Sequence, residues 1–317
     1  MDVIPIAEES LGVRAMAMFV KTRDFSILLD PGISLSPNRF GLPPHPRELE
    51  RVRALRSILE RYAEEANYVF ISHYHRDHFT VPYSSIYMGT ESESYRKIYS
   101  NKVLLLKSPD DENWSQRRRY YGLKKAIEDI VRNLVIADGK ELAIGSTRLV
   151  VSQSLPHGEE NAKTGRVIAI TIIDNDESLT FMPDVEGPIS QLAVSYVMSI
   201  RPKTLIVGGP PLYLLRRGFN KEYLDNALRN LTAILRAGFL NTLIIAHHTL
   251  RDLNWRASMK ALLDEAGRLR TSIMTYAGLL NREDELLEAM RKDLYAREPP
   301  PKDYLEQFRR VRDKGED

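Results

Sequence analysis

The chain of 317 residues contains no cysteine. Disulfides, thiolate metal ligands and a cysteine nucleophile are therefore all excluded. Any metal that the protein holds must be bound by histidine and by carboxylates. Histidine is itself scarce, with seven residues in the whole chain, so the positions of these seven carry information.

Neither sign of charge predominates, because 45 basic and 43 acidic residues leave a formal net charge of +2. A balanced chain has no global field typical of a nucleic-acid or membrane binder, so such a contact would need a local patch. No apolar run approaches the roughly 20 residues that a transmembrane helix needs. Residues 1–11 carry acidic side chains and lack the basic segment and apolar core of a signal peptide. We therefore expect a cytoplasmic protein without membrane contact, and the sequence indicates no oligomeric state.

The first part of the chain combines short apolar strands with helices. Two extended runs, 15–20 and 25–29, flank a charged turn and predict a hairpin. Apolar residues recur at three- and four-residue spacing in 47–66, which predicts an amphipathic helix. The next predicted elements are strands at 68–71 and 103–106 and a long basic helix at 113–133.

The middle of the chain, 134–184, is rich in β-branched runs separated by turn signals and predicts a second sheet. Its expected strands are 134–136, 141–144, 148–152, 167–173 and 179–182. Elements then alternate between helices at 189–199, 221–237, 255–266 and 283–297 and strands at 204–207 and 242–246. Two β-rich blocks bordered by helices predict an αββα sandwich of two mixed β-sheets flanked by helices. We assign residues 1–298 to one domain and 299–317 to a charged, partly helical or frayed tail.

A cluster of histidines directly follows the predicted strand 68–71, in the pattern His-x-His-x-Asp-His. His73 and His75 are two apart in extended backbone and project to the same side, and Asp77 and His78 follow where the chain turns away. Chance gives this arrangement with odds of about one in several thousand. One short loop can therefore offer four ligands to two adjacent metal ions.

Further candidate ligands also lie at the ends of predicted strands. His157 and Asp184 each follow a strand, and His247 and His248 close the strand 242–246. Neutral imidazole is the commonest nitrogen ligand of Zn²⁺, and a strand end is where a rigid scaffold can present it. The remaining histidine, His45, lies in a proline-rich loop, where we expect a solvated residue.

The order of these residues resembles the metallo-β-lactamase superfamily, whose members carry five ordered motifs across an αββα sandwich. The resemblance covers about residues 12–250, and the corresponding positions are Asp30, the cluster His73/His75/Asp77/His78, His157, Asp184 and a late histidine. The sequence also resembles a little-characterised archaeal branch of that superfamily, through Asp-Pro-Gly at 30–32 and His-His-x-x-Arg-Asp at 247–252.

The resemblance implies a role for each of these residues. The first metal would be bound by His73, His75 and His157. The second would be bound by Asp77, His78 and the late histidine. Asp184 would bridge the two metals. Asp30 would orient the ligand loop, since ligating imidazoles need their other N–H held; the alternative is ordinary turn chemistry before a proline. Adjacent strand residues point to opposite faces, so one of His247 and His248 should reach the metal, with a slight preference for His247.

The activity that the resemblance implies is hydrolysis by a hydroxide held between two ions, with Asp77, Asp184 and Asp30 as the carboxylates of the catalytic site. Zn²⁺ is the expected metal, and Mn²⁺ or Fe²⁺ are alternatives. The expected substrate is a small-molecule ester or amide, or a phosphodiester. Such ions lower the pKa of the shared water and stabilise charge in the transition state.

Two other functions compete with this interpretation. A nuclease or phosphodiesterase would act on nucleic acid, and the basic-aromatic segment 117–125, or Tyr213 with Arg216 and Arg217, could contact a polyanion. We favour a solvated helix face for these segments, because the overall charge is balanced. A redox di-iron protein or a non-hydrolytic metal scaffold is the alternative from another class. Redox members of the superfamily replace an early histidine with glutamate and add a flavin domain, and neither feature is present.

Overall fold

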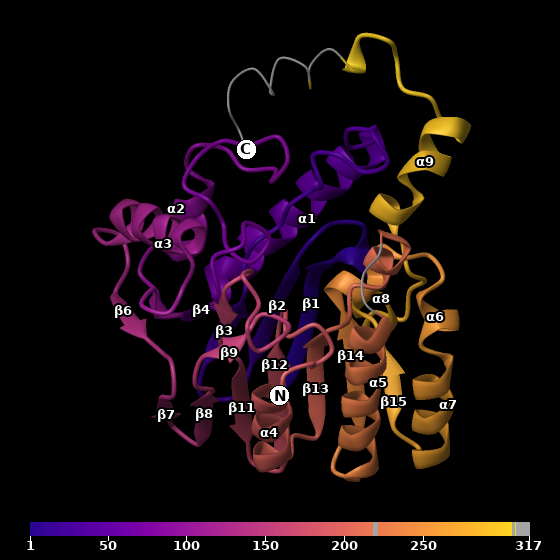
Figure 1. The fold of residues 1–317 in the computed structure, drawn as a ribbon. Helices are drawn as coiled ribbons and strands as arrows, with labels where there is room; N and C mark the ends of the chain where they lie inside the picture. Colours follow the sequence, from indigo (N-terminus) through magenta and orange to yellow (C-terminus); the bar gives the residue numbers. More distant parts are fainter. Residues whose placement is uncertain (218–220, 306–307, 309–317) are drawn as a thin grey trace.

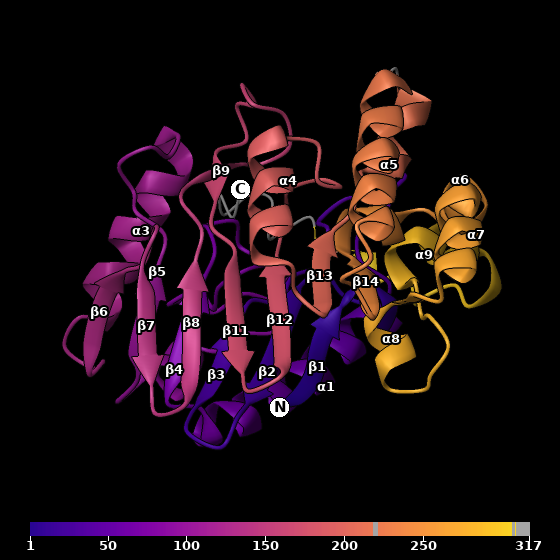
Figure 2. The same ribbon diagram turned by 90° about the horizontal axis from the view of Figure 1, so that it is seen from below.

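Two β-sheets pack face to face in the computed structural model, and helices cover their outer surfaces (Figures 1 and 2). The structure describes residues 1–217, 221–305 and 308. Within these ranges no helix is both long and apolar enough to cross a membrane.

The first sheet has six strands in the order of the chain. They are β1 (Asp2–Glu8), β2 (Met16–Lys21), β3 (Ser26–Leu29), β4 (Tyr68–Ile71), β5 (Val103–Leu106) and β6 (Asn133–Ile136). The first three pair antiparallel, and β3 to β6 pair parallel. The prediction that 134–136 belongs to the second sheet is therefore wrong: the helix after β5 returns the chain to the same sheet, as a parallel crossover does.

The second sheet has seven strands in the order β15-β14-β13-β12-β11-β8-β7. Their bounds are β7 (Glu141–Ile144), β8 (Thr147–Val151), β11 (Ile170–Asp174), β12 (Glu177–Met182), β13 (Thr204–Gly208), β14 (Thr242–Ala246) and β15 (Ser272–Met274). β7, β8, β11 and β12 pair antiparallel, and β12 to β15 pair parallel. The run predicted as one strand at 167–173 is divided, because β10 (Arg166–Val167) pairs separately with β9 (Leu155–Pro156).

The longer helices are α1 (Pro46–Glu65), α3 (Trp114–Ile127), α4 (Gln191–Ile200), α5 (Lys221–Arg236), α7 (Lys260–Leu269) and α9 (Leu287–Arg297). Shorter ones are α2 (Ser94–Tyr99), α6 (Trp255–Ser258), α8 (Tyr276–Leu279) and the 3₁₀ turns η1 (Glu9–Leu11), η2 (Leu212–Arg217) and η3 (His247–Arg251). α3 is shorter than predicted and α9 begins later. The helix predicted at 255–266 is broken at Met259, whose φ of −102° and ψ of 12° are not helical. The sequence analysis missed β1, β15, α2 and α8.

The hydrophobic core lies between the two sheets and between each sheet and its outer helices, with α1 and α3 packed on the first sheet. The inner layer fills the space between the sheets, where the rings of Phe70 on β4 and Phe181 on β12 meet edge to face at 6.4 Å. The outer layer of the second sheet lies between that sheet and the helices α4, α5 and α7. Fully burying a side chain such as phenylalanine contributes about 1.5–3 kcal/mol, so these layers fix how the two sheets face each other.

His45 is buried and caps α1, so the expectation of a solvated loop residue is wrong. Its Nδ1 accepts from the backbone N–H of Arg47 at 3.3 Å, and the side chain of Glu48 accepts from the His45 N–H at 2.8 Å. Its Nε2–H donates to the Glu298 carbonyl at 2.8 Å. This histidine is used to start a helix and to anchor the chain after α9.

The beginning of the predicted tail packs against the body of the protein. The Tyr304 hydroxyl donates to the Pro44 carbonyl at 2.7 Å, and the ring of Phe308 lies 5.9 Å from that of Tyr87. The rest of the predicted tail, 306–307 and 309–317, lies outside the described residues.

The strands that matter for function end at the same edge of the sandwich. β3 and β4 run parallel in the first sheet, and β12 and β14 run parallel to β13 in the second. Parallel strands present their carboxyl ends together. The residues that follow them, including Asp30, His73, Asp184 and His247, therefore meet where the two sheets face each other.

Candidate metal centre

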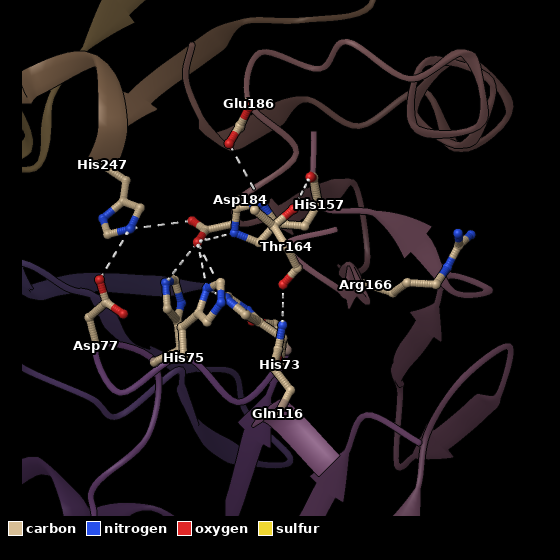
Figure 3. A network of polar contacts seen from close by, with 12 residues as sticks. His73, His75, Asp77, Gln116, His157, Thr164, Arg166, Asp184, Glu186 and His247 are labelled. Carbon is tan, nitrogen blue, oxygen red and sulfur yellow. Dashed lines mark hydrogen bonds and ion pairs between the residues drawn. The ribbon is translucent and has the colours of Figure 1, made fainter. Parts of the chain in front are cut away.

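The structure brings together all eight predicted ligands, which come from loops at the ends of strands. Figure 3 labels His73, His75, Asp77, His157, Asp184 and His247 among them. Their nitrogen and oxygen atoms form overlapping groups in which all atoms lie within 4.8 Å of one another. The groups are His73, His75, His157 and Asp184; Asp77, His78 and His247; and Asp184, His247 and His248.

Asp184 lies at the centre of the cluster, directly after β12. Its Oδ2 is 3.1–3.9 Å from four imidazole nitrogens, those of His157, His73, His78 and His75. Its Oδ1 is 3.4 Å from Nε2 of His247. The backbone turns sharply here, with φ of 50°, which aims the carboxylate inward. One carboxylate thus faces both halves of the cluster.

Asp30, fully buried at the end of β3, holds the loop that carries the histidine cluster. It accepts from the backbone N–H and the hydroxyl of Ser72 at 2.7 and 2.5 Å, and from Nδ1–H of His78 at 2.7 Å. Nδ1–H of His73 in turn donates to the Ser72 hydroxyl at 2.9 Å. Both imidazoles therefore direct Nε2 towards Asp184, and these are the contacts that an orienting residue requires.

Two glutamates that the sequence analysis overlooked hold His247. Nδ1–H of His247 donates to Glu9 Oε2 at 3.0 Å, and its backbone N–H donates to Glu8 Oε1 at 2.8 Å. Glu9 also accepts from Nε of Arg251 at 2.8 Å, and both glutamates are buried. An apolar run that ends in two carboxylates at 4–9 is the same strand-end pattern that identified the other ligands, and it could have revealed them.

Glu186 and Gln116 were also overlooked. Glu186 Oε1 lies 3.6 Å from Nδ1 of His157, and the Tyr223 hydroxyl donates to the same carboxylate. Gln116 of α3 accepts from the Tyr74 N–H at 2.8 Å and donates to the Thr164 carbonyl at 2.7 Å. Gln116 therefore ties the histidine loop of the first sheet to the His157 loop of the second.

His247 and His248 both reach the cluster, because the strand ends at Ala246 and the two histidines begin the 3₁₀ turn η3. The alternation expected of strand residues therefore does not apply to them. Nε2 of His247 lies 3.5 Å from Asp77 Oδ2 and 3.4 Å from Asp184 Oδ1. Nδ1 of His248 has no hydrogen-bond partner among the described residues.

Burial shapes the charge of the cluster. Desolvation lowers the pKa of His73, His75 and His248, so these imidazoles are neutral, which is the form that binds a metal. Burial opposes the charge of Asp184, yet the neighbouring His247 and His78 hold the pKa of this carboxyl well below its ordinary value. The centre therefore combines an ionised carboxylate with three neutral imidazoles, whereas His78 and His157, although buried, have a raised pKa because the Asp184 carboxylate faces them.

Several buried atoms of the cluster lack a hydrogen-bond partner among the described residues: Nε2 of His78, Nδ1 of His157, Oδ1 of Asp184 and Nδ1 of His248. An unpaired buried polar atom is costly. Buried nitrogen and carboxylate donors that converge in this way fit a divalent cation, so the residues present suit the metal centre that the fold implies.

The cluster forms the floor of a cavity of about 940 Å³, which is large enough for a drug-sized or nucleotide-sized molecule. The cluster residues that line it are His75, Asp77, His157, Asp184 and His248. A ligand in this cavity would therefore lie against the centre.

Two facing mixed sheets, outer helices and a histidine-aspartate centre at the strand ends define a metallo-β-lactamase fold. YhfI from Bacillus subtilis, a metallo-β-lactamase fold protein, superposes on this chain with a TM-score of 0.50 at 13% identity. The superposition covers 86% of this chain and 95% of YhfI. The predicted fold class is confirmed.

No family model matches the chain. A UPF0282 protein of Pyrobaculum arsenaticum is 52% identical over 299 residues, which are 94% of this chain and 95% of the relative. A UPF0282 protein of Saccharolobus islandicus is 38% identical over 303 residues, 95% of each chain. The chain belongs to the UPF0282 family, and the predicted resemblance to an archaeal branch is confirmed.

Proposed function

We propose that this protein is a hydrolase that depends on two divalent cations, with Zn²⁺ favoured. The observation that carries the proposal is the Asp184 carboxylate, which faces two groups of buried nitrogen donors at once. We propose that His73, His75 and His157 bind the first cation. Asp77, His78 and His247 would bind the second, and Asp184 would bind both.

The donor set supports Zn²⁺, because imidazole nitrogens outnumber the carboxylates and no thiolate is available. Mn²⁺ and Fe²⁺ accept the same nitrogen and oxygen donors, so they are the alternatives. We choose His247 over His248 as the late ligand, since Glu9 holds its Nδ1–H and leaves Nε2 facing Asp77 and Asp184.

When bound, a pair of such cations activates a water molecule for attack and stabilises the charge that develops on a carbonyl or phosphoryl oxygen. The chain's own residues prepare this centre. Asp30, Glu9 and Glu186 each face the outer nitrogen of a different imidazole and so fix its orientation. The substrate enters through the cavity above them.

Asp77 lies on the cavity floor as an ionised ligand. Although its burial opposes ionisation, the neighbouring His78, His247 and Arg251 hold the pKa of this carboxyl well below its ordinary value. A carboxyl of this kind is a poor proton donor at neutral pH. We therefore assign Asp77 to cation binding and not to protonation of the leaving group.

The hydrolase domain would be residues 1–298, and a cytoplasmic location stays a prediction.

The test is the metal content of the purified protein by elemental analysis, together with hydrolysis of p-nitrophenyl acetate and bis(p-nitrophenyl) phosphate. We expect about two zinc ions per chain and metal-dependent cleavage of at least one substrate. His75→Ala should lose about one ion and the activity. The matched control is His45→Asn, which changes a histidine outside the cluster and keeps a good helix cap, and it should retain both. A chain that binds no metal after reconstitution would contradict the proposal.

A further inference from the structure

The wall of the cavity above the proposed metal centre carries a concentration of positive charge. Its arginines are Arg14, Arg76, Arg118, Arg119 and Arg251. Its carboxylates are Asp77, Asp184 and Glu186, all of which belong to the centre or directly contact it. Among the described residues, the outer wall therefore has cations and no acidic side chain, although the chain as a whole is nearly neutral.

Two of these arginines are left for a ligand. Arg14 donates to Glu288 at 2.5 and 2.7 Å and Arg251 donates to Glu9 at 2.8 Å, so both already have a counter-ion. Arg118 and Arg119 form no ion pair within the described part of the chain.

Arg119 is half-buried, and one of its N–H groups donates to the Tyr74 carbonyl at 3.2 Å. Burial lowers the pKa of Arg119 and the nearby Arg76 lowers it further, against smaller opposing effects of Asp77 and Tyr83. A partly desolvated cation beside another cation is unfavourable unless an anion compensates for it. An anionic group of a substrate would supply that compensation.

An aromatic surface adjoins these arginines at the mouth of the cavity. Trp114 is 74% exposed, and the Arg118 guanidinium lies 5.5 Å from the centre of its ring. Tyr83, also part of the lining, is 41% exposed. Tryptophan is highly buried on average, and aromatic faces next to arginine are surfaces on which nucleobases stack.

One face of α3 supplies these groups, and its position is fixed. Trp114, Arg118 and Gly122 are spaced four residues apart and therefore lie on the same side of the helix. Gln116, on the same helix, hydrogen-bonds to both loops that carry the proposed ligands. Gly122 lines the cavity, and a Cβ atom there would meet nothing within 4 Å, so the wall is hollow at this point.

We propose that the cavity binds a short nucleotide phosphodiester, with its phosphoryl oxygens on Arg118 and Arg119 and a base against Trp114. Guanidinium groups can bind phosphoryl oxygens through two parallel hydrogen bonds. Arg118 and Arg119 would bind a second phosphate of the ligand, next to the phosphate that is cleaved. The inference rests on the proposed hydrolase function. Water adds its oxygen to phosphorus, the P–O bond to the leaving alcohol breaks, and the proton goes to that alcohol.

Isothermal titration calorimetry of the zinc-loaded protein tests the binding. The probes are adenosine 5′-monophosphate, adenosine, inorganic phosphate and benzoate. We expect the nucleotide to bind at least about tenfold more tightly than each of the others, because it alone uses both the arginines and the aromatic face. Equal affinity for adenosine would overturn the role of the anion, equal affinity for phosphate would overturn the role of the base, and equal affinity for benzoate would overturn the phosphoryl group.

Variants of α3 identify the residues. The double variant Arg118→Gln/Arg119→Gln should weaken nucleotide binding about tenfold or more and leave adenosine unchanged. Trp114→Ala should weaken nucleotide and adenosine and leave phosphate unchanged. Lys125→Gln is the control, since it removes one exposed charge from the same helix outside the cavity.

Hydrolysis separates this inference from the proposed function. The double variant should lower cleavage of the 5′-phosphorylated dinucleotide pApA, which carries a second phosphate beside the scissile one, and leave cleavage of neutral p-nitrophenyl acetate unchanged. An equal loss on both substrates, with metal content intact, would overturn the inference and leave the hydrolase proposal standing. Absence of metal would overturn the hydrolase proposal, whereas the calorimetric ranking of the four probes would still decide whether the cavity prefers nucleotides.

Discussion

At the scale of single residues, the proposed centre depends on buried carboxylates that hold its imidazoles, among them Asp30 at His78 and Glu9 at His247. His73 and His78 stand out because their spacing is rare and their strand is evident. Glu9 contacts His247 across 238 positions of the chain. The strand-end pattern at 4–9 marks Glu9 as a candidate, but no local pattern identifies its partner, because the contact depends on how the end of β1 packs against the end of β14. Asp30 was identified through the order of motifs, and its neighbour Ser72 was not.

Glu9→Gln tests whether this buried carboxylate supports the proposed second cation. The change keeps the shape of the side chain and removes the charge that faces His247 Nδ1–H and Arg251. Loss of such an outer partner typically weakens metal affinity about 10- to 100-fold. We expect this loss for one of the two zinc ions in a competitive titration with a chelating dye.

The control for this prediction is Glu50→Gln, an exposed glutamate on α1. It should leave both affinities unchanged. If Glu9→Gln weakened both ions equally, or neither, Glu9 would not act through His247.

At the scale of elements, hydrophobic periodicity located most helices and strands but not their partners. The run at 134–136 was correctly predicted as a strand and assigned to the wrong sheet, since apolar residues do not state which sheet they join. β15 is three residues long, and its side chains are half-buried, so no alternation was visible. Met259 interrupts a helix whose apolar pattern continues across the break, and a periodicity argument cannot detect a change in backbone dihedral angles.

Gly122→Ala should stabilise α3, because glycine within a helix costs about 0.5–1 kcal/mol relative to alanine. No atom lies within 4 Å of the position that the new Cβ would take, so the substitution introduces no clash. Urea denaturation followed by circular dichroism should show a higher midpoint with an unchanged slope.

Gly165→Ala is the matched substitution and should have the opposite sign. Its φ is +110°, and a Cβ there would collide with the side chain of Gln116. A Gly122→Ala protein with a lowered midpoint would show that the space beside α3 is not free.

At the scale of the whole molecule, the centre exists only when both sheets are in place. The first sheet contributes the loops with Asp30 and His73 to His78, the second contributes Asp184 and His247, and His157 follows β9 in the connection from β8 to β11. A cation held by both therefore binds the folded chain in preference to the unfolded one. The sequence predicted this architecture because the order of motifs matches the order of strands, and this agreement was more informative than any single residue.

Metal removal should accordingly lower the thermal stability of the entire chain. Binding to the native state alone adds about 2.7 kcal/mol when the free cation is at 100 times its dissociation constant. We expect the midpoint in scanning calorimetry to fall after dialysis against a chelator and to return with zinc. Magnesium at the same concentration is the control, because a nitrogen-rich centre suits it poorly. If the thermal unfolding midpoint did not change when zinc was bound, the centre would not link the two sheets.

The order of the ligands along the chain also determines when each cation site can be completed during synthesis, because the amino-terminal end leaves the ribosome first. Every proposed ligand of the first cation has left the exit tunnel once Asp184 has emerged, whereas the second cation must wait for His247. Glu9 is among the earliest residues made, and its partner His247 follows 238 positions later. Cation loading is thus expected to be stepwise, with the second position completed only after β14 joins its sheet.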